Sequence, residues 1–284
     1  MKMYAKSGQR GFTLVELSVV LVIIGLLLGA VLKGQEMINT AQAKRAANDI
    51  KNMEAQIWLH ADRQGGRLPG DCNRDGLIGF SLRDGEDSVL DNLGTTVQQA
   101  AARVNLLDYR VLPLEQGDVT NVDHNRVYCA PHAGDGNNLT LANALAGMED
   151  NANVPYNDLK SINLISGQSA NRAVSKIAEG HMYIGFVRVP QGEGDDAVAT
   201  DYNAIVITDV PAWMARTISI EIDGFDEPAD RGRFRRVNNA GSGFEGEWTY
   251  GVETNDLVNA IYFFDRIPRN GGTITSVPAV EEPE

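Results

Sequence analysis

Cysteine is scarce in this chain: the 284 residues hold only Cys72 and Cys129. Two cysteines exclude a disulfide-dense mini-fold, and their wide spacing is not that of a zinc knuckle. They allow a single disulfide if the domain lies in an oxidising compartment. The rest of the sequence has to identify that compartment.

Basic charge is also scarce, with 25 Lys and Arg against 38 Asp and Glu and a net charge of -13. This balance disfavours a nucleic-acid backbone as the main partner and favours cations or basic protein surfaces. With 43% hydrophobic residues the chain is not disordered, and it can build one large globular domain or two small ones.

Signatures of common enzymes are missing. The sequence contains no Gly-x-Ser-x-Gly elbow, P-loop, dinucleotide fingerprint or His-Glu-x-x-His helix. The run RGRFRR at residues 231–236 is interpreted as a solvated strand that balances nearby acids, in preference to a partner-binding patch. We therefore predict that the protein is not an enzyme.

One long hydrophobic run is present. Residues 12–32 carry no charge except Glu16, and residues 1–11 hold three basic residues and no acidic one. The run is long enough to span a bilayer and too long for a secretory signal peptide, so it predicts a retained anchor. The basic leader predicts a cytoplasmic N-terminus, which places the chain after Lys33 on the far side of the membrane.

Glu16 is the exception within this run. An ionisable residue inside a membrane segment costs about 2.5–3.5 kcal/mol on insertion scales, so such residues usually mark a function. The carboxylate of Glu16 therefore predicts a partner of opposite charge.

The residues GFTLVE at 11–16, between a short basic leader and an apolar run, resemble the N-terminal motif of type IV prepilins and type II secretion pseudopilins. The resemblance implies cleavage by a prepilin peptidase between Gly11 and Phe12, and N-methylation of Phe12. The new amine would pair with Glu16 of a neighbouring subunit inside an apolar filament core, because an unpaired buried charge is heavily penalised. The alternative is an ordinary anchor with Glu16 at the membrane interface.

The helical pattern continues beyond the membrane segment. Apolar residues recur at spacings of three and four with charges between them, and Gly65-Gly66 supplies a stop signal. We therefore predict one helix over residues 12–64, with residues 12–32 as transmembrane and assembly segment and an amphipathic half packed on the head. At 1.5 Å per residue it is about 80 Å long.

Residues 65–284 show neither repeats nor a shift in composition, which predicts one exported globular head. Segments rich in Val, Ile, Phe and Tyr predict a small antiparallel sheet, and helical spacing predicts two short helices. The family resemblance favours a helix at residues 211–222, and residues 192–201 are predicted as a surface connection. The predicted strands are 182–189, 204–208, 232–237 and 257–265, and the two short helices are 95–107 and 139–148. The fold class is α+β: a pilin-like long N-terminal helix on a small sheet with loop-rich insertions.

The run DCNRDGLI at residues 71–78 alternates oxygen-bearing side chains before a glycine, as at the start of a calcium loop. The twelfth position, where such a loop has its bidentate acid, is Leu82. A turn closed by its own Asx hydrogen bonds explains the pattern equally well. The predicted calcium ligands are Asp71, Asn73 and Asp75, with Asp84, Glu86 or Asp87 closing the shell.

Both cysteines fall in the predicted exported head, so we predict a Cys72–Cys129 disulfide. In the chain-entropy model it stabilises the fold by about 4–5 kcal/mol. Zinc binding through Cys129 and His132 is the alternative.

The sequence thus predicts a structural subunit, a minor pilin of a bacterial type IV pilus, assembled through its N-terminal helix. The alternatives are a type II secretion pseudopilin and a membrane-tethered periplasmic binding or hydrolytic domain. The expected partners are other pilin or pseudopilin subunits, a prepilin peptidase, an inner-membrane assembly platform and, before assembly, membrane lipid. The expected location is a single-pass inner-membrane protein with a periplasmic head, and later an extracellular or periplasmic filament.

Overall fold

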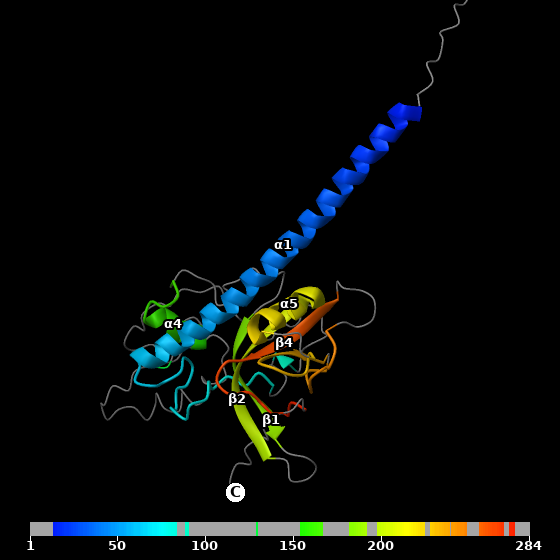
Figure 1. Cartoon of the computed structure of the whole chain (residues 1–284). Coiled ribbons are helices and arrows are strands. Elements are labelled where there is room, and N and C mark those ends of the chain that lie inside the picture. The colour runs from blue at the N-terminus through cyan, green and yellow to red at the C-terminus, as the bar shows by residue number, and fades with distance from the viewer. Residues whose placement is uncertain are drawn as a thin grey trace, which may run out of the picture. The chain divides into compact units, whose positions relative to one another are not determined.

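The computed structural model describes residues 14–83, 89–90, 129, 154–166, 182–191, 198–224, 228–238, 240–248, 256–269 and 273–275. Its elements are α1 (Leu14–Arg63), α4 (Val154–Ser161), β1 (Met182–Gln191), β2 (Val198–Pro211), α5 (Ala212–Asp223), β3 (Phe234–Val237) and β4 (Leu257–Phe263) (Figure 1). A long N-terminal helix and a small antiparallel sheet define an α+β class that is consistent with a pilin-like fold.

Helix α1 runs from Leu14 to Arg63, close to the predicted bounds of 12–64. Its end follows from the two glycines: Gly65 and Gly66 have φ of 67° and 91°, and the Gly66 N–H donates to the carbonyl of Ala61 at 2.7 Å. A left-handed backbone of this kind closes the last turn and stops the helix.

The chain divides into two compact units, Met1–Gln42 and Ala43–Glu284, and α1 contributes to both. In the first unit the large apolar side chains of α1 from Leu14 to Ile38 are exposed. In the second unit one face of the helix is buried in the main core. This face consists of Ala43, Ala46, Ala47, Ile50, Met53, Ile57, His60 and Ala61.

The sheet has the order β1-β2-β4-β3, and all its pairs are antiparallel. The four predicted strands all exist, but β2 begins at Val198, so the prediction of a surface connection over residues 192–201 was wrong for its last four residues. Val198 pairs with Gln191 at the tip of a long β1–β2 hairpin. Sequence reasoning missed the start of this strand for two reasons. The segment is rich in Gly and Asp, and the first residues of the strand are exposed or half-buried.

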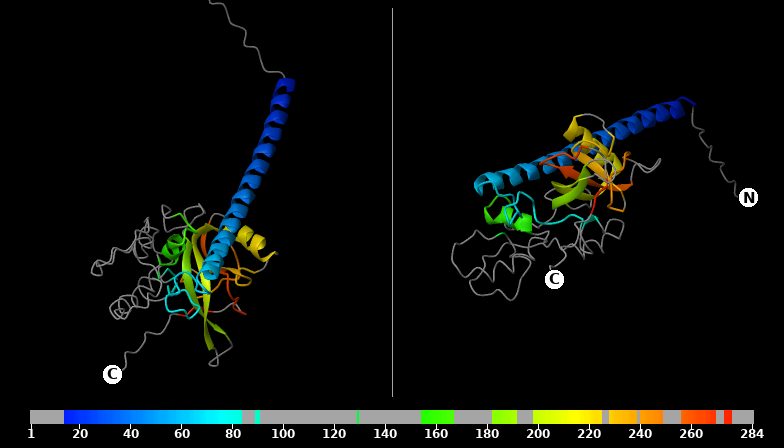
Figure 2. Two further views of the ribbon diagram at one scale, coloured as in Figure 1. Left: turned by 90° about the vertical axis from the view of Figure 1, so that its left-hand side faces the viewer. Right: turned by 90° about the horizontal axis from the view of Figure 1, so that it is seen from below.

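Both faces of the sheet are covered. Ile205 and Ile207 of β2 join the cluster that contains the second half of α1 and α5, which lie against the strands in Figure 2. The alternate residues Ala204 and Val206 join a second cluster with Phe80, Leu82, Val89 and Leu90. This alternation is the period of two expected for a strand between two layers.

The helix favoured at residues 211–222 is α5, which begins at Ala212 and ends at Gly224 in the left-handed region. Helix α4 was not predicted, and seven of its eight residues are buried, including Asn157, Asp158 and Lys160. Its polar composition gave no apolar stripe to recognise. The predicted helices at 95–107 and 139–148 lie outside the described residues.

A close contact joins the segment after α1 to α4. Gly70 has φ of 85°, and a Cβ built on it would lie 2.8 Å from Cγ of Pro155. Gly76 has nearly the same φ, 88°, but a Cβ there would have no heavy atom within 4 Å. Replacing either glycine therefore strains the left-handed backbone, but only a side chain at Gly70 would also clash with its neighbours.

We predict that Gly70→Ala destabilises a fragment of residues 43–284 by about 2–4 kcal/mol, because the left-handed conformation and the clash with Pro155 add together. The matched variant Gly76→Ala should cost about 1–2 kcal/mol, from the backbone alone. Urea unfolding followed by circular dichroism measures both. Equal losses would show that Gly70 is not packed against Pro155.

Candidate functional site

The predicted calcium loop forms a turn closed by its own side chains. Asp71 accepts the N–H of Asp75 through Oδ1 at 3.1 Å and the N–H of Gly76 through Oδ2 at 3.2 Å. Asp75 in turn accepts the N–H of Leu77 at 2.8 Å and the side-chain amide of Asn73 at 2.9 Å. Burial raises the pKa of Asp71, and the hydrogen bond from Gly76 opposes the shift.

A buried amide ties this turn to the sheet. Asn203 of β2 accepts the N–H of Ile78 at 2.9 Å and donates to the carbonyl of Gly76 at 2.8 Å. The geometry is that of the Asx turn offered as the alternative. Within the described ranges no group of three or more His, Cys, Asp and Glu could hold a metal. Asp84, Glu86 and Asp87 lie outside those ranges, so calcium binding stays a prediction.

Cys72 and Cys129, the two cysteines predicted as a pair, form a disulfide in the structure, with their Cα atoms 5.0 Å apart. His132, the other ligand of the zinc alternative, lies outside the described residues. The disulfide closes a loop across 57 positions of sequence.

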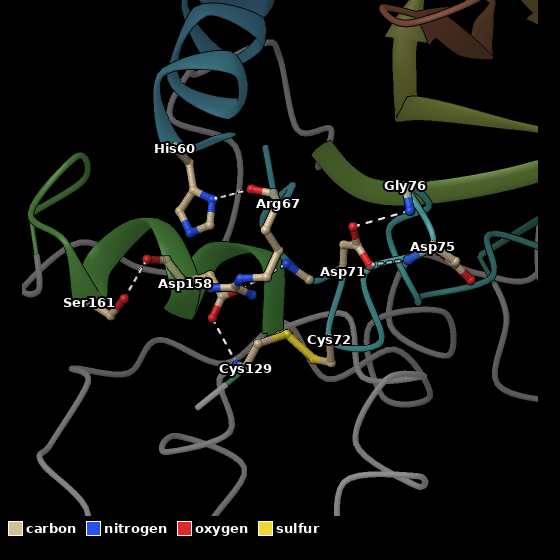
Figure 3. Close-up of polar contacts among 10 residues, drawn as sticks. His60, Arg67, Asp71, Cys72, Asp75, Gly76, Cys129, Asp158 and Ser161 are labelled. Carbon is tan, nitrogen blue, oxygen red and sulfur yellow. Dashed lines mark hydrogen bonds and ion pairs between the residues drawn. A yellow bond between two sulfur atoms is a disulfide. The ribbon is translucent and has the colours of Figure 1, made fainter. Parts of the chain in front are cut away.

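Next to the disulfide, Asp158 of α4 is the centre of a buried polar cluster (Figure 3). Its Oδ2 pairs with Nη1 of Arg67 at 2.8 Å and accepts the N–H of Gly70 at 2.9 Å, while its Oδ1 accepts the N–H of Cys129 at 2.8 Å. Burial raises the pKa of Asp158, and the guanidinium of Arg67 and the N–H donors oppose that rise. A fully buried carboxylate is tolerated only with such donors.

His60 connects this cluster to the end of α1. Its Nδ1 lies 3.1 Å from the carbonyl oxygen of Arg67, and its Nε2 is buried with no hydrogen-bond partner. Burial is the main cause that lowers the pKa of His60 to about 4, and the contact with the Arg67 carbonyl opposes it. The ring is therefore neutral at pH 7, with the proton on Nδ1.

The interpretation of residues 231–236 as a solvated strand was wrong for residues 234–236, which are buried in β3. Arg235 and Arg236 are 2% and 1% exposed. Arg235 donates to the carbonyls of Gly232 and Pro268, and its guanidinium lies over the rings of Phe244 and Phe263. Carbonyl oxygens and ring faces replace water around the cation. Burial still lowers the pKa of Arg235 to about 10.

A neighbouring cluster fastens α1 to the sheet. Glu54 of α1 pairs with Nη2 of Arg233 at 3.0 Å and accepts the hydroxyl hydrogen of Tyr262. Arg233 also donates to the carbonyls of Phe263 and Phe264. Sequence reasoning missed the two contacts of Glu54 because they span 179 and 208 positions.

Glu16, the predicted assembly residue, lies in the first turn of α1 with an exposed side chain. The large apolar side chains that follow it up to Leu32 are exposed too. Helix α1 alone among the described helices is long and apolar enough to cross a membrane. Gly11 and Phe12, the predicted cleavage and methylation residues, lie outside the described residues.

Residues 6–32 match the family model described as the prokaryotic N-terminal methylation motif, which is the prepilin-type signal of type IV pilins and pseudopilins. The motif supports a subunit of the pilin or pseudopilin type, a structural family that is generally not enzymatic. It implies processing by a prepilin peptidase and assembly with other pilin subunits, and with the apolar helix it supports membrane anchoring. No curated protein and no solved structure matches the chain.

We predict that the fragment 43–284 loses stability as the pH falls from about 6.5 to about 4. Above pH 6.5 His60 is neutral in both states. Below it the unfolded state binds a proton that the folded state does not, so up to about 3 kcal/mol of unfolding free energy is lost.

The variant His60→Gln should flatten this slope, because glutamine does not titrate. Urea unfolding at several pH values measures it, and the difference between the two proteins isolates His60 from Asp158 and Asp71. Parallel pH curves would contradict the prediction.

Proposed function

We propose that this protein is a minor pilin: a structural subunit of a bacterial type IV pilus that is cut after Gly11 and assembled through the first half of α1. The observation that carries the proposal is an apolar helix surface that continues beyond the part a membrane could cover. The methylation motif at residues 6–32 independently supports a subunit of the pilin or pseudopilin type.

The apolar surface extends past an exposed ion pair. Lys33 and Glu36 pair at 2.7 Å with side chains that are 70% and 67% exposed, which is expected of residues at or outside the membrane surface. Beyond Lys33, Met37 and Ile38 are still 67% and 58% exposed. Residues beyond such charges lie outside the lipid tails, so a protein surface is the better candidate to cover them.

The occupant we infer is another pilin-type subunit, because the exposed apolar surface includes positions suited to helix packing. Ile24, Val31 and Ile38 recur every seven residues, and each is exposed. A repeat of seven keeps one face of a helix toward a partner helix. Gly25 and Gly29 belong to the same segment, and a Cβ on either would meet nothing within 4 Å. Packing within the chain therefore does not explain two glycines, whereas close approach of a second helix does.

Glu16 supplies the register of this assembly. After cleavage the amine of Phe12 carries a positive charge, and the carboxylate of Glu16 on a neighbouring subunit is its proposed partner. In an apolar filament core both charges would otherwise be buried at a high cost. The pair thus favours one axial offset between subunits.

The head is exported and displayed in this proposal. The basic leader holds the N-terminus in the cytoplasm, the chain crosses the inner membrane once, and the head folds in the periplasm before the subunit enters an extracellular filament. A disulfide is suited to that compartment. An inner-membrane assembly platform and, before assembly, membrane lipid are further partners.

Two alternatives make different predictions. A type II secretion pseudopilin would use the same helix surface, but in a periplasmic filament. A tethered binding or hydrolytic domain would keep its leader and carry a deep pocket. In the described part, a groove of about 280 Å³ lies on one face of α1, with Asp49, Met53, Gln56 and Leu59 among its lining residues.

The removal of the leader after Gly11 can be tested directly. We predict that the protein recovered from membranes begins at a methylated Phe12, and that Gly11→Val leaves the leader attached because the peptidase cuts after a small residue. Mass spectrometry of the N-terminal peptide measures both. Wild-type protein that still begins at Met1 would rule out the pilin proposal and favour the tethered domain.

Assembly is testable at Glu16. We predict that Glu16→Ala is cleaved and inserted normally but enters sheared filaments at least about tenfold less than wild type, because a buried amine loses its counter-charge. Glu36→Ala is the matched control, since it removes a carboxylate from the same helix in an exposed ion pair. Equal incorporation of the two variants would show that Glu16 has no role in assembly.

A further inference from the structure

Asp158 contacts the backbone beside both halves of the disulfide. Its Oδ1 accepts the N–H of Cys129 itself, and its Oδ2 accepts the N–H of Gly70, two positions before Cys72 (Figure 3). One carboxylate thus binds the backbone on both sides of a disulfide whose cysteines are 57 positions apart in sequence. The carboxylate itself is fixed, because α4 is buried and Arg67 pairs with it at 2.8 Å.

The packing around Gly70 leaves little freedom to the segment before Cys72. A Cβ on Gly70 would lie 2.8 Å from Pro155 and 3.1 Å from Ile78, so the backbone runs directly against α4. Cys72 therefore follows a rigid attachment to the helix that carries Asp158. On the other side, the hydrogen bond to Asp158 fixes the backbone nitrogen of Cys129.

We propose that Asp158 is a positioning residue for formation of the Cys72–Cys129 disulfide, and that the carboxylate and the disulfide stabilise each other. In the reduced chain the two thiols are joined only through a long loop, whose closure is entropically unfavourable. The two hydrogen bonds to Asp158 keep both segments in place and raise the effective concentration of one thiol at the other. By linkage, the disulfide favours the same two hydrogen bonds.

The chemistry is ordinary thiol–disulfide exchange. One cysteine thiolate attacks an external disulfide and releases one thiol, and the second cysteine then displaces the other thiol from the mixed disulfide. The two electrons and two protons lost by Cys72 and Cys129 appear on the external disulfide, which becomes two thiols. Asp158 takes no part in bond making and acts through the backbone alone.

The test is the redox equilibrium of the full-length protein in detergent with mixtures of reduced and oxidised glutathione. After acid quenching, free thiols are alkylated with a maleimide polymer, and gel mobility gives the oxidised fraction. We expect Asp158→Asn to lower the equilibrium constant for oxidation about tenfold or more, because the amide NH₂ cannot accept either N–H and the remaining oxygen can serve only one.

Asp201→Asn is the matched control. Asp201 pairs with Arg188 at 2.6 Å on the β1–β2 hairpin, so Asp201→Asn also removes an aspartate–arginine ion pair. Among the described residues its carboxylate bonds to Arg188 and not to the backbone near Cys72 or Cys129. Its equilibrium constant should stay within about twofold of wild type. An unchanged constant in Asp158→Asn, or an equal shift in both variants, would overturn the proposal.

A second measurement uses the wild-type protein and does not depend on a variant that folds. Complete reduction should increase hydrogen–deuterium exchange in peptides covering residues 67–72 and 154–161, because the disulfide no longer supports the bonds to Asp158. Exchange in residues 182–191 of β1 should stay the same. If reduction leaves the first two peptides as protected as before, the proposed coupling does not exist.

Discussion

Helix α1 is one continuous helix whose first half lies outside the core of the head and whose second half packs into that core. The arrangement of the rest of the chain follows from this constraint. Up to Gln42 its large apolar side chains are exposed within the chain, and from Ala43 onward one face is buried in the core of the head. The change is visible in residue size. Ala43, Ala46 and Ala47 open the buried face, and their small side chains allow close packing.

Two polar clusters join distant segments of the head. Glu54, which is half-buried, links α1 to Arg233, the residue before β3, and to Tyr262 of β4. Asp158, which is fully buried, links α4 to the segment after α1 and to the disulfide. A buried ion pair contributes little net stability compared with apolar packing, but removing one partner is costly. Such links therefore specify which segments meet more than they raise stability.

The predictable part of this structure is the part with strong local signals. The apolar run with the three- and four-residue spacing after it predicted α1, and segments rich in Val, Ile, Phe and Tyr predicted the strands of the sheet. Helix α4 was missed because Asn157, Asp158 and Lys160 are polar and are buried by tertiary contacts alone. Arg235 and Arg236 were misread for the same reason: the carbonyls of Pro268 and Glu247, and the ring of Phe263 beside Arg235, come from other parts of the chain.

The candidate site also has one part that the sequence predicts and one part that it does not. The motif around Gly11, Phe12 and Glu16 is local, so the sequence is enough to recognise it, and the match at residues 6–32 covers it. The hydrogen bonds of Asp158 to Gly70 and Cys129 span 88 and 29 positions and leave no mark in the sequence. The cysteine pair was predictable only because the chain offers a single pairing.

In the proposed assembly through the first half of α1, Ile38 lies against another subunit. A photoreactive phenylalanine analogue introduced at position 38 measures this directly in intact cells, with the same analogue at the exposed Ile220 of α5 as control. Irradiation should give covalent adducts between position 38 and a second pilin-type chain, abolished when the leader cannot be cut. Adducts to lipid alone, or the same adducts from position 220, would contradict assembly through this helix.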